Sequence, residues 1–224
     1  MGMQRSDGSL QWAVSRWRGG YRDTSIMLTL PKMFLMLAMF SSICFGVQID
    51  NLYDHAPEFT ADGQMKLPQD YRRWVYLSTG MDMSYAQGAG APDHHMFDNV
   101  FVNPEAYETF VETGKWPEKT TFVLEVRGAE QKASINQRGH FQGGLMGVEV
   151  HVKDSKRFEG GWAFFGFDDM VKTAKMTPKT EACYSCHQSH GAVDTTFVQF
   201  YPTLLPIAKS KQTLSAEYKK ELVE

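Results

Sequence analysis

The sequence predicts an α+β fold, mainly antiparallel β-sheet with a few short helices, formed by one domain. Aromatic residues make up 13% of the 224 residues, and 19 Gly and 9 Pro supply many turns. Several segments alternate between apolar and polar residues, which is typical of half-buried strands. This composition favours sheets and turns over a helical bundle or a coiled coil. Neither an internal repeat nor a low-complexity segment is present.

The first half of the domain predicts two strands and one helix. Residues 71–77 are aromatic and β-branched, which suits a strand or a short helix that leads into one. Residues 81–92 contain glycine and proline and predict a flexible loop. Residues 97–102 predict a strand. The next three residues, Asn103, Pro104 and Glu105, supply an N-cap, a proline at the first helical position and an acid in the first turn. We therefore expect a helix from Pro104 to about Glu112 that ends at Gly114.

Two further segments alternate and predict strands with distinct faces. In residues 120–126, one face carries Phe122, Leu124 and Val126. In residues 145–152, one face carries Met146, Val148, Val150 and Val152, and the other carries Gly147, Glu149 and His151. Hairpin-linked strands of this kind, with a few short helices, favour an antiparallel α+β domain.

The last third of the chain predicts one more strand and then short helices. Residues 160–167 form an aromatic strand candidate that contains Trp162, Phe164 and Phe165, which we expect to pack in the core or against a cofactor. Residues 181–187 and 196–209 are helical or turn-like. We expect the second of these to be interrupted at Pro202 and Pro206.

The N-terminus predicts an export signal. Residues 33–47 are apolar and uncharged, Lys32 precedes them, and small residues lie near their end. A membrane-spanning helix needs about 20 apolar residues, so this run is short for an anchor, although an uncleaved anchor stays an alternative. We predict a leader with a secretory signal peptide over 1–46, a true start at Met27, a lead-in segment over 47–64, a domain over 65–209 and a C-terminal tail over 210–224.

The net charge argues against a nucleic-acid-binding protein, and the cysteines indicate a cofactor. The formal net charge of −3 is not that of a nucleic-acid binder. Removal of residues 1–46 takes away Cys44 and leaves only Cys183 and Cys186. Residues 183–187 read C-Y-S-C-H, which is the attachment signature of c-type haem. Two thiols on one helical turn can each bond to a vinyl group, and His187 can then bind the iron.

Other interpretations of the pair are a disulfide, two free thiols, a zinc site that includes His187 or His190, and a thioredoxin-like redox pair. Zinc would need further ligands at matching spacing, and the mature chain has no other cysteine. A thioredoxin-like pair would follow a strand of a βαβ unit near the chain start. The export signal and the pair of cysteines favour one covalent haem c.

The chain resembles the cytochrome P-460 family, which includes the cytochrome c′-beta proteins, over nearly all of the predicted domain. The matching stretches are LPQDYRRWV (67–75), VFVNPEAY (100–107), TGKW (113–116), GVEVHVKDSKRF (147–158), GGWAF (160–164), CYSCH (183–187) and FVQFYPTL (197–204). The resemblance implies a β-rich monohaem fold, often dimeric, with His187 as the only protein ligand of the iron. It also implies an open distal position, at which family members oxidise hydroxylamine or bind nitric oxide.

One position departs from the family's enzymes. Those enzymes cross-link a lysine to the porphyrin, and Leu124 stands at the place of that lysine, while Lys115 and Lys119 lie several residues away. The chain is therefore more similar to the cytochrome c′-beta proteins, and Leu124 is a predicted haem contact.

Glu149 matches a family carboxylate near the distal face of the haem. A carboxylate there could accept protons from a nitrogenous substrate, which makes Glu149 the candidate catalytic residue. The alternative is that Glu149, on an alternating strand, simply faces water. Five other histidines (His94, His95, His140, His151, His190) are expected to be surface or structural residues. Four methionines are weak candidates for a sixth iron ligand: Met81, Met83, Met96 and Met146.

Three functions follow as expectations. The first is a periplasmic haem protein that binds nitric oxide or a similar ligand, or that transfers electrons to a redox partner protein. The second is a hydroxylamine or nitric oxide oxidoreductase in which Glu149 acts as the distal base. The third is a six-coordinate electron carrier. A homodimer is compatible with each of them.

Overall fold

The computed structural model describes residues 55–84, 94–167 and 171–223. The chain divides into two units, 1–48 and 49–224, and every described residue belongs to the second unit. The predicted signal peptide and residues 85–92 of the predicted loop lie outside the described residues. Within the described part of the chain, no helix is both long and apolar enough to cross a membrane.

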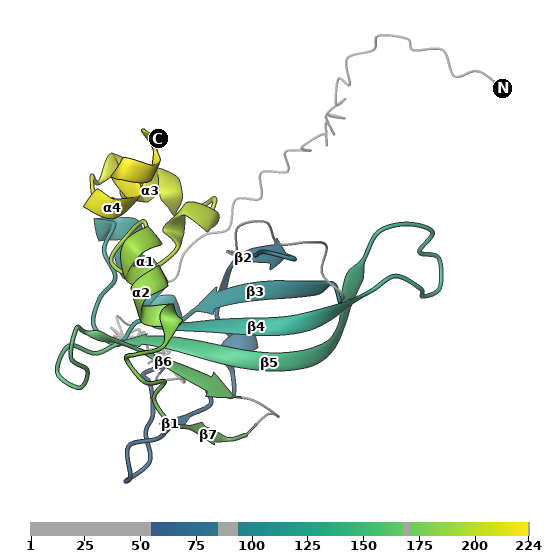
Figure 1. Cartoon of the computed structure of the whole chain (residues 1–224), viewed down its shortest axis with the longest axis horizontal. Coiled ribbons are helices and arrows are strands. Elements are labelled where there is room, and N and C mark those ends of the chain that lie inside the picture. Colours follow the sequence, from purple (N-terminus) through teal and green to yellow (C-terminus); the bar gives the residue numbers. More distant parts are fainter. Residues whose placement is uncertain (1–54, 85–93, 168–170, 224) are drawn as a thin grey trace, which may run out of the picture. The chain divides into compact units, whose positions relative to one another are not determined.

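The described residues form seven strands and a set of short helices (Figure 1), which confirms the predicted α+β class. The strands are β1 (Met65–Lys66), β2 (Val75–Met81), β3 (Met96–Val102), β4 (Thr121–Glu130), β5 (Phe141–Lys153), β6 (Trp162–Phe167) and β7 (Thr173–Ala174). The helices are α1 (Pro104–Thr113), α2 (Ala182–His190), α3 (Leu205–Ser210) and α4 (Ala216–Glu221), with 3-10 turns η1 (Tyr71–Arg73) and η3 (Val198–Phe200).

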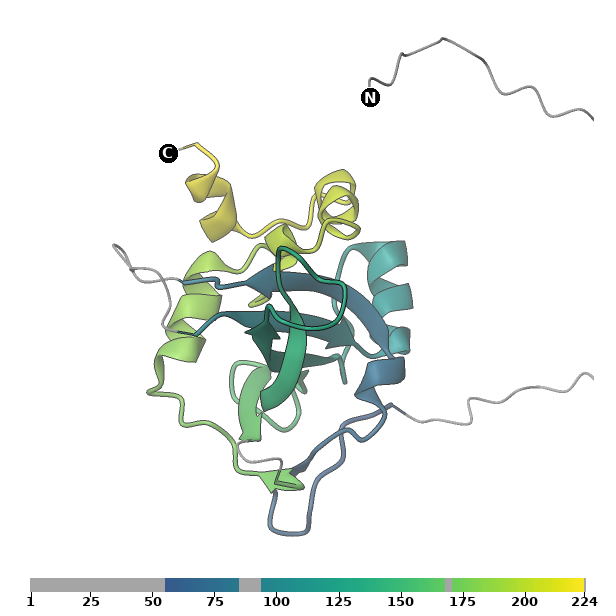
Figure 2. The same ribbon diagram turned by 90° about the vertical axis from the view of Figure 1, so that its right-hand side faces the viewer.

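Five strands form one antiparallel sheet in the order β2-β3-β4-β5-β6, so each strand pairs with its neighbour in the sequence. The short strands β1 and β7 pair separately. Figures 1 and 2 show α3 and α4 on the opposite side of the five-stranded sheet from the β1–β7 pair. The sheet therefore separates two packed regions.

Each face of the sheet carries its own hydrophobic core. The first core contains the inward residues of β4, β5 and β6 and those of β1, η1 and β7, among them Met65, Tyr71, Val123, Val148, Val150 and Phe165. The second core joins the other face to the helices, through Val102, Phe110, Trp116, Phe122, Trp162 and Leu204. Burial of both faces follows from the alternation of side chains along each strand.

A buried ionic cluster fixes β4 to the first core. The carboxylate of Glu125 accepts hydrogen bonds from Tyr71 Oη at 2.5 Å, from Arg72 Nε at 2.7 Å and from Arg127 Nε at 2.5 Å. Burial alone would raise the pKa of Glu125, but these three hydrogen bonds together hold that pKa below its ordinary value. Since Glu125 lies between Leu124 and Val126, the cluster also fixes the opposite face of the strand.

The predicted helix after Asn103 is confirmed as α1. Pro104 lies in its first turn, and Gly114 ends it in the left-handed conformation at φ 72°, with its N–H donating to Phe110 O at 2.7 Å. A Cβ at Gly114 would lie 2.7 Å from Lys211 Cβ, so the glycine also permits the C-terminal segment to approach α1. The predicted helix or helix-to-strand transition over 71–77 is likewise present, as η1 followed by β2.

The predicted face of residues 145–152 is wrong at one position. Val148, Val150 and Val152 are buried as expected, but Met146 is 53% exposed. The pairing shifts at this point, because Val126 pairs with Gly147 whereas Arg127 pairs with Leu145. This bulge reverses the alternation, so that Leu145 instead of Met146 packs against the first core.

Pro206 does not interrupt the last segment as expected. It lies in the first turn of α3, where a missing N–H costs nothing. The residues predicted as a C-terminal tail contain α4, which begins after Ser215. Ser215 Oγ accepts from Tyr218 N at 3.0 Å and donates to Gly191 O at 2.7 Å, so this segment is connected to the loop after α2.

Candidate functional site

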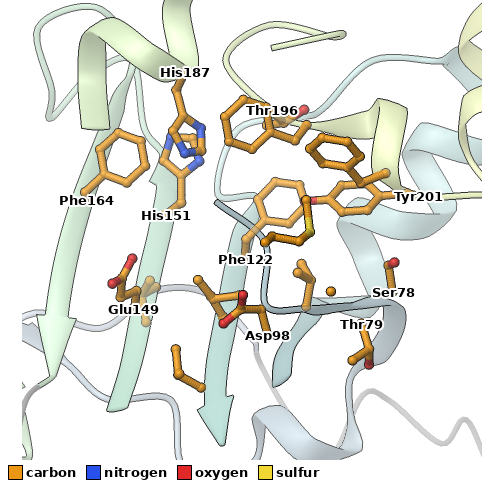
Figure 3. A pocket seen from close by; sticks show the side chains of 18 of the residues that line it. Ser78, Thr79, Asp98, Phe122, Glu149, His151, Phe164, His187, Thr196 and Tyr201 are labelled. Carbon is orange, nitrogen blue, oxygen red and sulfur yellow. The ribbon is translucent and has the colours of Figure 1, made fainter. Parts of the chain in front are cut away.

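A cavity of about 690 Å³ opens between the sheet and the helices, on the face that also carries the second core. Its floor comes from β2, β3, β4 and β5, and its opposite side comes from α2 and the segment 196–201 (Figure 3). The residues that line it are Ser78, Thr79, Gly80, Met83, Met96, Asp98, Val100, Phe122, Leu124, Val126, Glu149, Val150, His151, Phe164, His187, Thr196, Phe197, Phe200 and Tyr201. Most of this lining is apolar or aromatic, which is typical of a pocket for a cofactor.

The strand register aligns a row of side chains across the floor. Val100 pairs with Leu124, and Leu124 pairs with Glu149. Directly paired residues point to the same face of a sheet, and all three line the cavity. The predicted face of β4, with Phe122 and Val126 beside Leu124, is confirmed, since all three residues reach the cavity.

His187 faces the cavity from the side opposite to Glu149 (Figure 3). It lies on α2, and its Nδ1 is 2.7 Å from the carbonyl oxygen of Thr195. A carbonyl only accepts, so Nδ1 carries the hydrogen and the lone pair of the ring lies on Nε2. Burial lowers the pKa of His187, although the bond to Thr195 opposes this change. The ring is thereby kept neutral, which is the form that binds a metal.

A tight loop after α2 brings Thr195 back to His187. An added Cβ at Gly191 would lie 2.6 Å from His187 O, 2.8 Å from Thr196 N and 2.9 Å from Thr195 C. A side chain at Gly191 would therefore push the loop away from the helix. The backbone carbonyl of Thr195 was not predictable from residue types.

Three rings surround His187. The His151 ring is stacked on Phe164 at 4.0 Å between centroids, and it meets the His187 ring nearly edge-on at 5.0 Å. Phe197 lies on another side, at 4.2 Å. Burial, followed by the nearby His187 and Lys179, lowers the pKa of His151 well below its ordinary value. His151 was expected to be a surface or structural residue, and it is a buried residue of the cavity wall.

The two cysteines lie on α2 beside His187. Positions 183, 186 and 187 are three and four residues apart, so their side chains share one side of the helix. Both thiols are free and half-buried. Burial, followed by Cys183 and Glu221, raises the pKa of Cys186, which favours the protonated thiol. Neither cysteine is among the cavity-lining residues.

Asp98 is a cavity residue that the sequence reasoning missed. It lies on β3, two positions before Val100 and therefore on the same face. Burial, followed by the charge of Asp82, raises the pKa of Asp98. The strand predicted over 97–102 could have identified Asp98, because the alternation of side chains along a strand places Asp98 on the same face as Val100.

The other candidate ligands separate into two groups. Met83 and Met96 line the cavity, whereas Met81 and Met146 do not. Of the remaining histidines, none except His151 is in the cavity lining. Four of them have acidic or polar partners: His55 contacts Glu105, His95 contacts Asp82, His140 contacts Gln131 and His190 contacts Glu221.

The residues fit a haem. A neutral imidazole with its free nitrogen toward an apolar cavity can bind the iron, and the two thiols lie on the same side of the helix as this imidazole. Among the described residues, no three His, Cys, Asp or Glu side chains are arranged to hold a metal ion. None of the described residues that line the cavity is a lysine, and Lys119 instead contacts Asp154.

Comparison with known proteins gives one family. The sequence model of the cytochrome P460 family matches residues 68–198, which is more than half of the chain and includes the floor, α2 and the loop after it. A comparison with curated proteins found no match.

Proposed function

The chain belongs to the cytochrome P460 family and is therefore a haem-binding cytochrome, and we propose that it is an exported c-type protein with one haem. In this proposal the iron keeps an open distal position that takes nitric oxide or a similar small ligand. The observation that carries the proposal is the orientation of His187, whose Nε2 is directed away from Thr195 and toward a cavity of about 690 Å³.

The attachment through Cys183 and Cys186 is part of this proposal. Each S–H would add across one vinyl group, which forms a thioether and leaves no by-product. The helix supports this chemistry, since it presents both thiols on the side that carries His187. The bound haem would supply an iron that coordinates small molecules.

The chain's own residues would then control what reaches the iron. The bond from Nδ1 to Thr195 holds the orientation of the ring and raises the basicity of Nε2. Leu124, Val100 and Phe122 present apolar side chains to the cavity, which would exclude water from the floor. An apolar floor favours small neutral ligands, because a charged ligand would lose its hydration there.

A second candidate function is the oxidation of hydroxylamine or nitric oxide. It is favoured by Glu149, which reaches the cavity and pairs with Leu124 across the sheet. A carboxylate at this place could accept a proton from a bound nitrogenous substrate. Leu124 argues against a fast enzyme, since it provides no amine for a porphyrin cross-link.

A third candidate is a six-coordinate electron carrier. It is favoured by Met83 and Met96, whose side chains line the same cavity as His187. A thioether ligand would occupy the position that the first proposal leaves open.

An absorption spectrum of the purified ferrous protein distinguishes the three functions. We expect a high-spin spectrum that changes when nitric oxide is added. A low-spin spectrum with split bands, unchanged by nitric oxide, would indicate a methionine ligand and contradict the open site. A Soret band shifted far to the red would indicate a cross-linked porphyrin and favour the enzyme.

We also propose a periplasmic location, because haem c is attached after export and residues 33–47 have the character of a signal peptide. N-terminal sequencing of the mature protein should place its start close to Gly46 and Val47. Recovery of residues 1–46 on the mature haem protein would overturn the cleavage. A redox partner protein and a homodimer are further parts of the proposal, and sedimentation of the holoprotein tests the dimer.

A further inference from the structure

The floor of the cavity carries two carboxyl groups on different strands. Asp98 on β3 pairs with Val126 on β4, and Val126 pairs with Gly147 on β5. Glu149 lies two residues farther along β5, in the neighbouring row of the same face. Figure 3 shows both carboxyl groups on the floor, across the cavity from His187.

Asp98 has no stabilising partner among the described residues. Its side chain is half-buried, and in the described ranges no hydrogen bond or ion pair reaches its carboxylate. After burial, the charge of Asp82 raises the pKa of Asp98, and Asp82 Oδ2 is itself 2.6 Å from His95 Nδ1. His140 lies against His95, with ring centroids 4.8 Å apart. Within the described ranges, His95 contacts Asp82 and His140 contacts His95, and neither histidine forms a hydrogen bond or ion pair with Asp98.

The lining is acidic as a whole. Asp98 and Glu149 are its carboxyl groups, and none of the described lining residues is Lys or Arg. The lining also holds two histidines, His151 and His187, which lie among the aromatic rings of Phe164 and Phe197. An anion that enters the cavity would meet negative charge in a region of low dielectric constant, where charges interact strongly.

We propose that Asp98, together with Glu149, makes the cavity select against anionic ligands of the haem iron, so that neutral ligands are preferred. This inference rests on the proposed function, because it needs an open iron position that faces the floor. Asp98 is then a specificity-determining residue, and protonation of its carboxyl group relaxes the selection.

The test compares an anion and a neutral ligand on the ferric holoprotein. Sodium azide and imidazole are titrated separately, and their affinities are read from the Soret band. The variants are Asp98→Asn, Glu149→Gln, the double variant, and Glu108→Gln as the matched control. Glu108 is exposed on α1 and is outside the cavity lining, so its replacement removes the same charge elsewhere.

We expect Asp98→Asn to bind azide about threefold to tenfold more tightly than the wild type, with the affinity for imidazole unchanged. The double variant should bind azide more tightly than either single variant, and Glu108→Gln should behave as the wild type. When the pH is lowered, the affinity ratio of Asp98→Asn to wild type should approach one, because Asp98 becomes protonated. Protonation of azide itself lowers the affinity of both proteins equally, so it does not change this ratio.

Two results would overturn the inference, and they can be distinguished. If imidazole binds but Asp98→Asn and Glu108→Gln have the same affinity for azide, the inference fails and the open site stands. If neither ligand changes the spectrum of the wild type or of any variant, the open site fails and the inference fails with it.

Discussion

The Nδ1 atom of His187 lies 2.7 Å from the carbonyl oxygen of Thr195, although the two residues are separated by a helix end and a turn. This bond fixes the tautomer of the ring and its rotation about the side-chain axis. Because the acceptor is a backbone atom, its position depends on the path of the loop. The loop in turn depends on Gly191, which contacts it without a side chain.

We predict that Gly191→Ala weakens the ligation of the iron. The added Cβ would be 2.6 Å from His187 O, so the loop has to move, and we expect a loss of about 1–3 kcal/mol in the free energy of unfolding. The absorption spectrum of the ferrous protein should show a mixture of ligation states. Gly144→Ala is the control, since a Cβ there meets nothing within 4 Å, and it should leave the spectrum unchanged. A wild-type spectrum for Gly191→Ala would show that the loop does not orient His187.

Replacement of both cysteines should separate haem binding from haem attachment. In Cys183→Ser/Cys186→Ser, the thiols that would hold the ring are absent while His187 and the cavity are kept. We expect the wild type to retain its haem on a denaturing gel stained for peroxidase activity, and the double variant to lose it. Ser185→Ala, on the exposed side of α2, is the control and should retain the haem. Extraction of the wild-type haem into acid acetone would contradict covalent attachment.

The holoprotein should contain no bond between a lysine and the porphyrin. Leu124 occupies the floor opposite Glu149, and Lys119 instead contacts Asp154. Intact mass measurement together with peptide mapping should therefore find one haem peptide, with Cys183 and Cys186. We expect slow turnover of hydroxylamine or none. A second peptide on the porphyrin that contains Lys115 or Lys119 would contradict this prediction and restore the enzyme.

The ionic cluster of Glu125 should make stability depend on pH. Glu125→Gln should lower the free energy of unfolding by about 2 kcal/mol near neutral pH, because it removes the charge that Arg127 and Arg72 contact. The folded pKa of Glu125 lies below its ordinary value of 4.5, so this stabilisation is present above that value and is lost as the pH falls through the folded pKa. Urea denaturation at several pH values measures the difference.

Glu108→Gln is the control for this series, since the exposed Glu108 should change the stability by less than about 0.5 kcal/mol. The difference between wild type and Glu125→Gln should shrink in acid. A difference that stays constant down to acid pH would show that the charge of Glu125 does not stabilise the fold.

Much of the fold was predictable because its signals are local. The alternation over 120–126 and 145–152 gave two strands, and the Asn103-Pro104 start and the Gly114 end gave α1. Met146 was assigned to the wrong face because a bulge depends on how two strands pair, which one strand's pattern does not contain.

The site was predictable only in part, for the same physical reason. The pattern C-x-x-C-H is contiguous, so the sequence alone could identify His187 as a candidate iron ligand. Asp98 and His151 reach the cavity through strand register and packing, and Thr195 contributes a backbone carbonyl that any residue would supply. Contacts of this kind exist only in the folded chain.

The irregular pairing between β4 and β5 divides one long ladder into two parts. Toward the helices the register is continuous from Thr121 to Val126, and this part holds Leu124 opposite Glu149. Beyond Val126 the register shifts twice before the hairpin reaches its tip, where Ile135 is 90% exposed. An insertion or deletion near the tip would be absorbed at these shifts, so the hairpin can change in length over evolution while the floor of the cavity keeps its register.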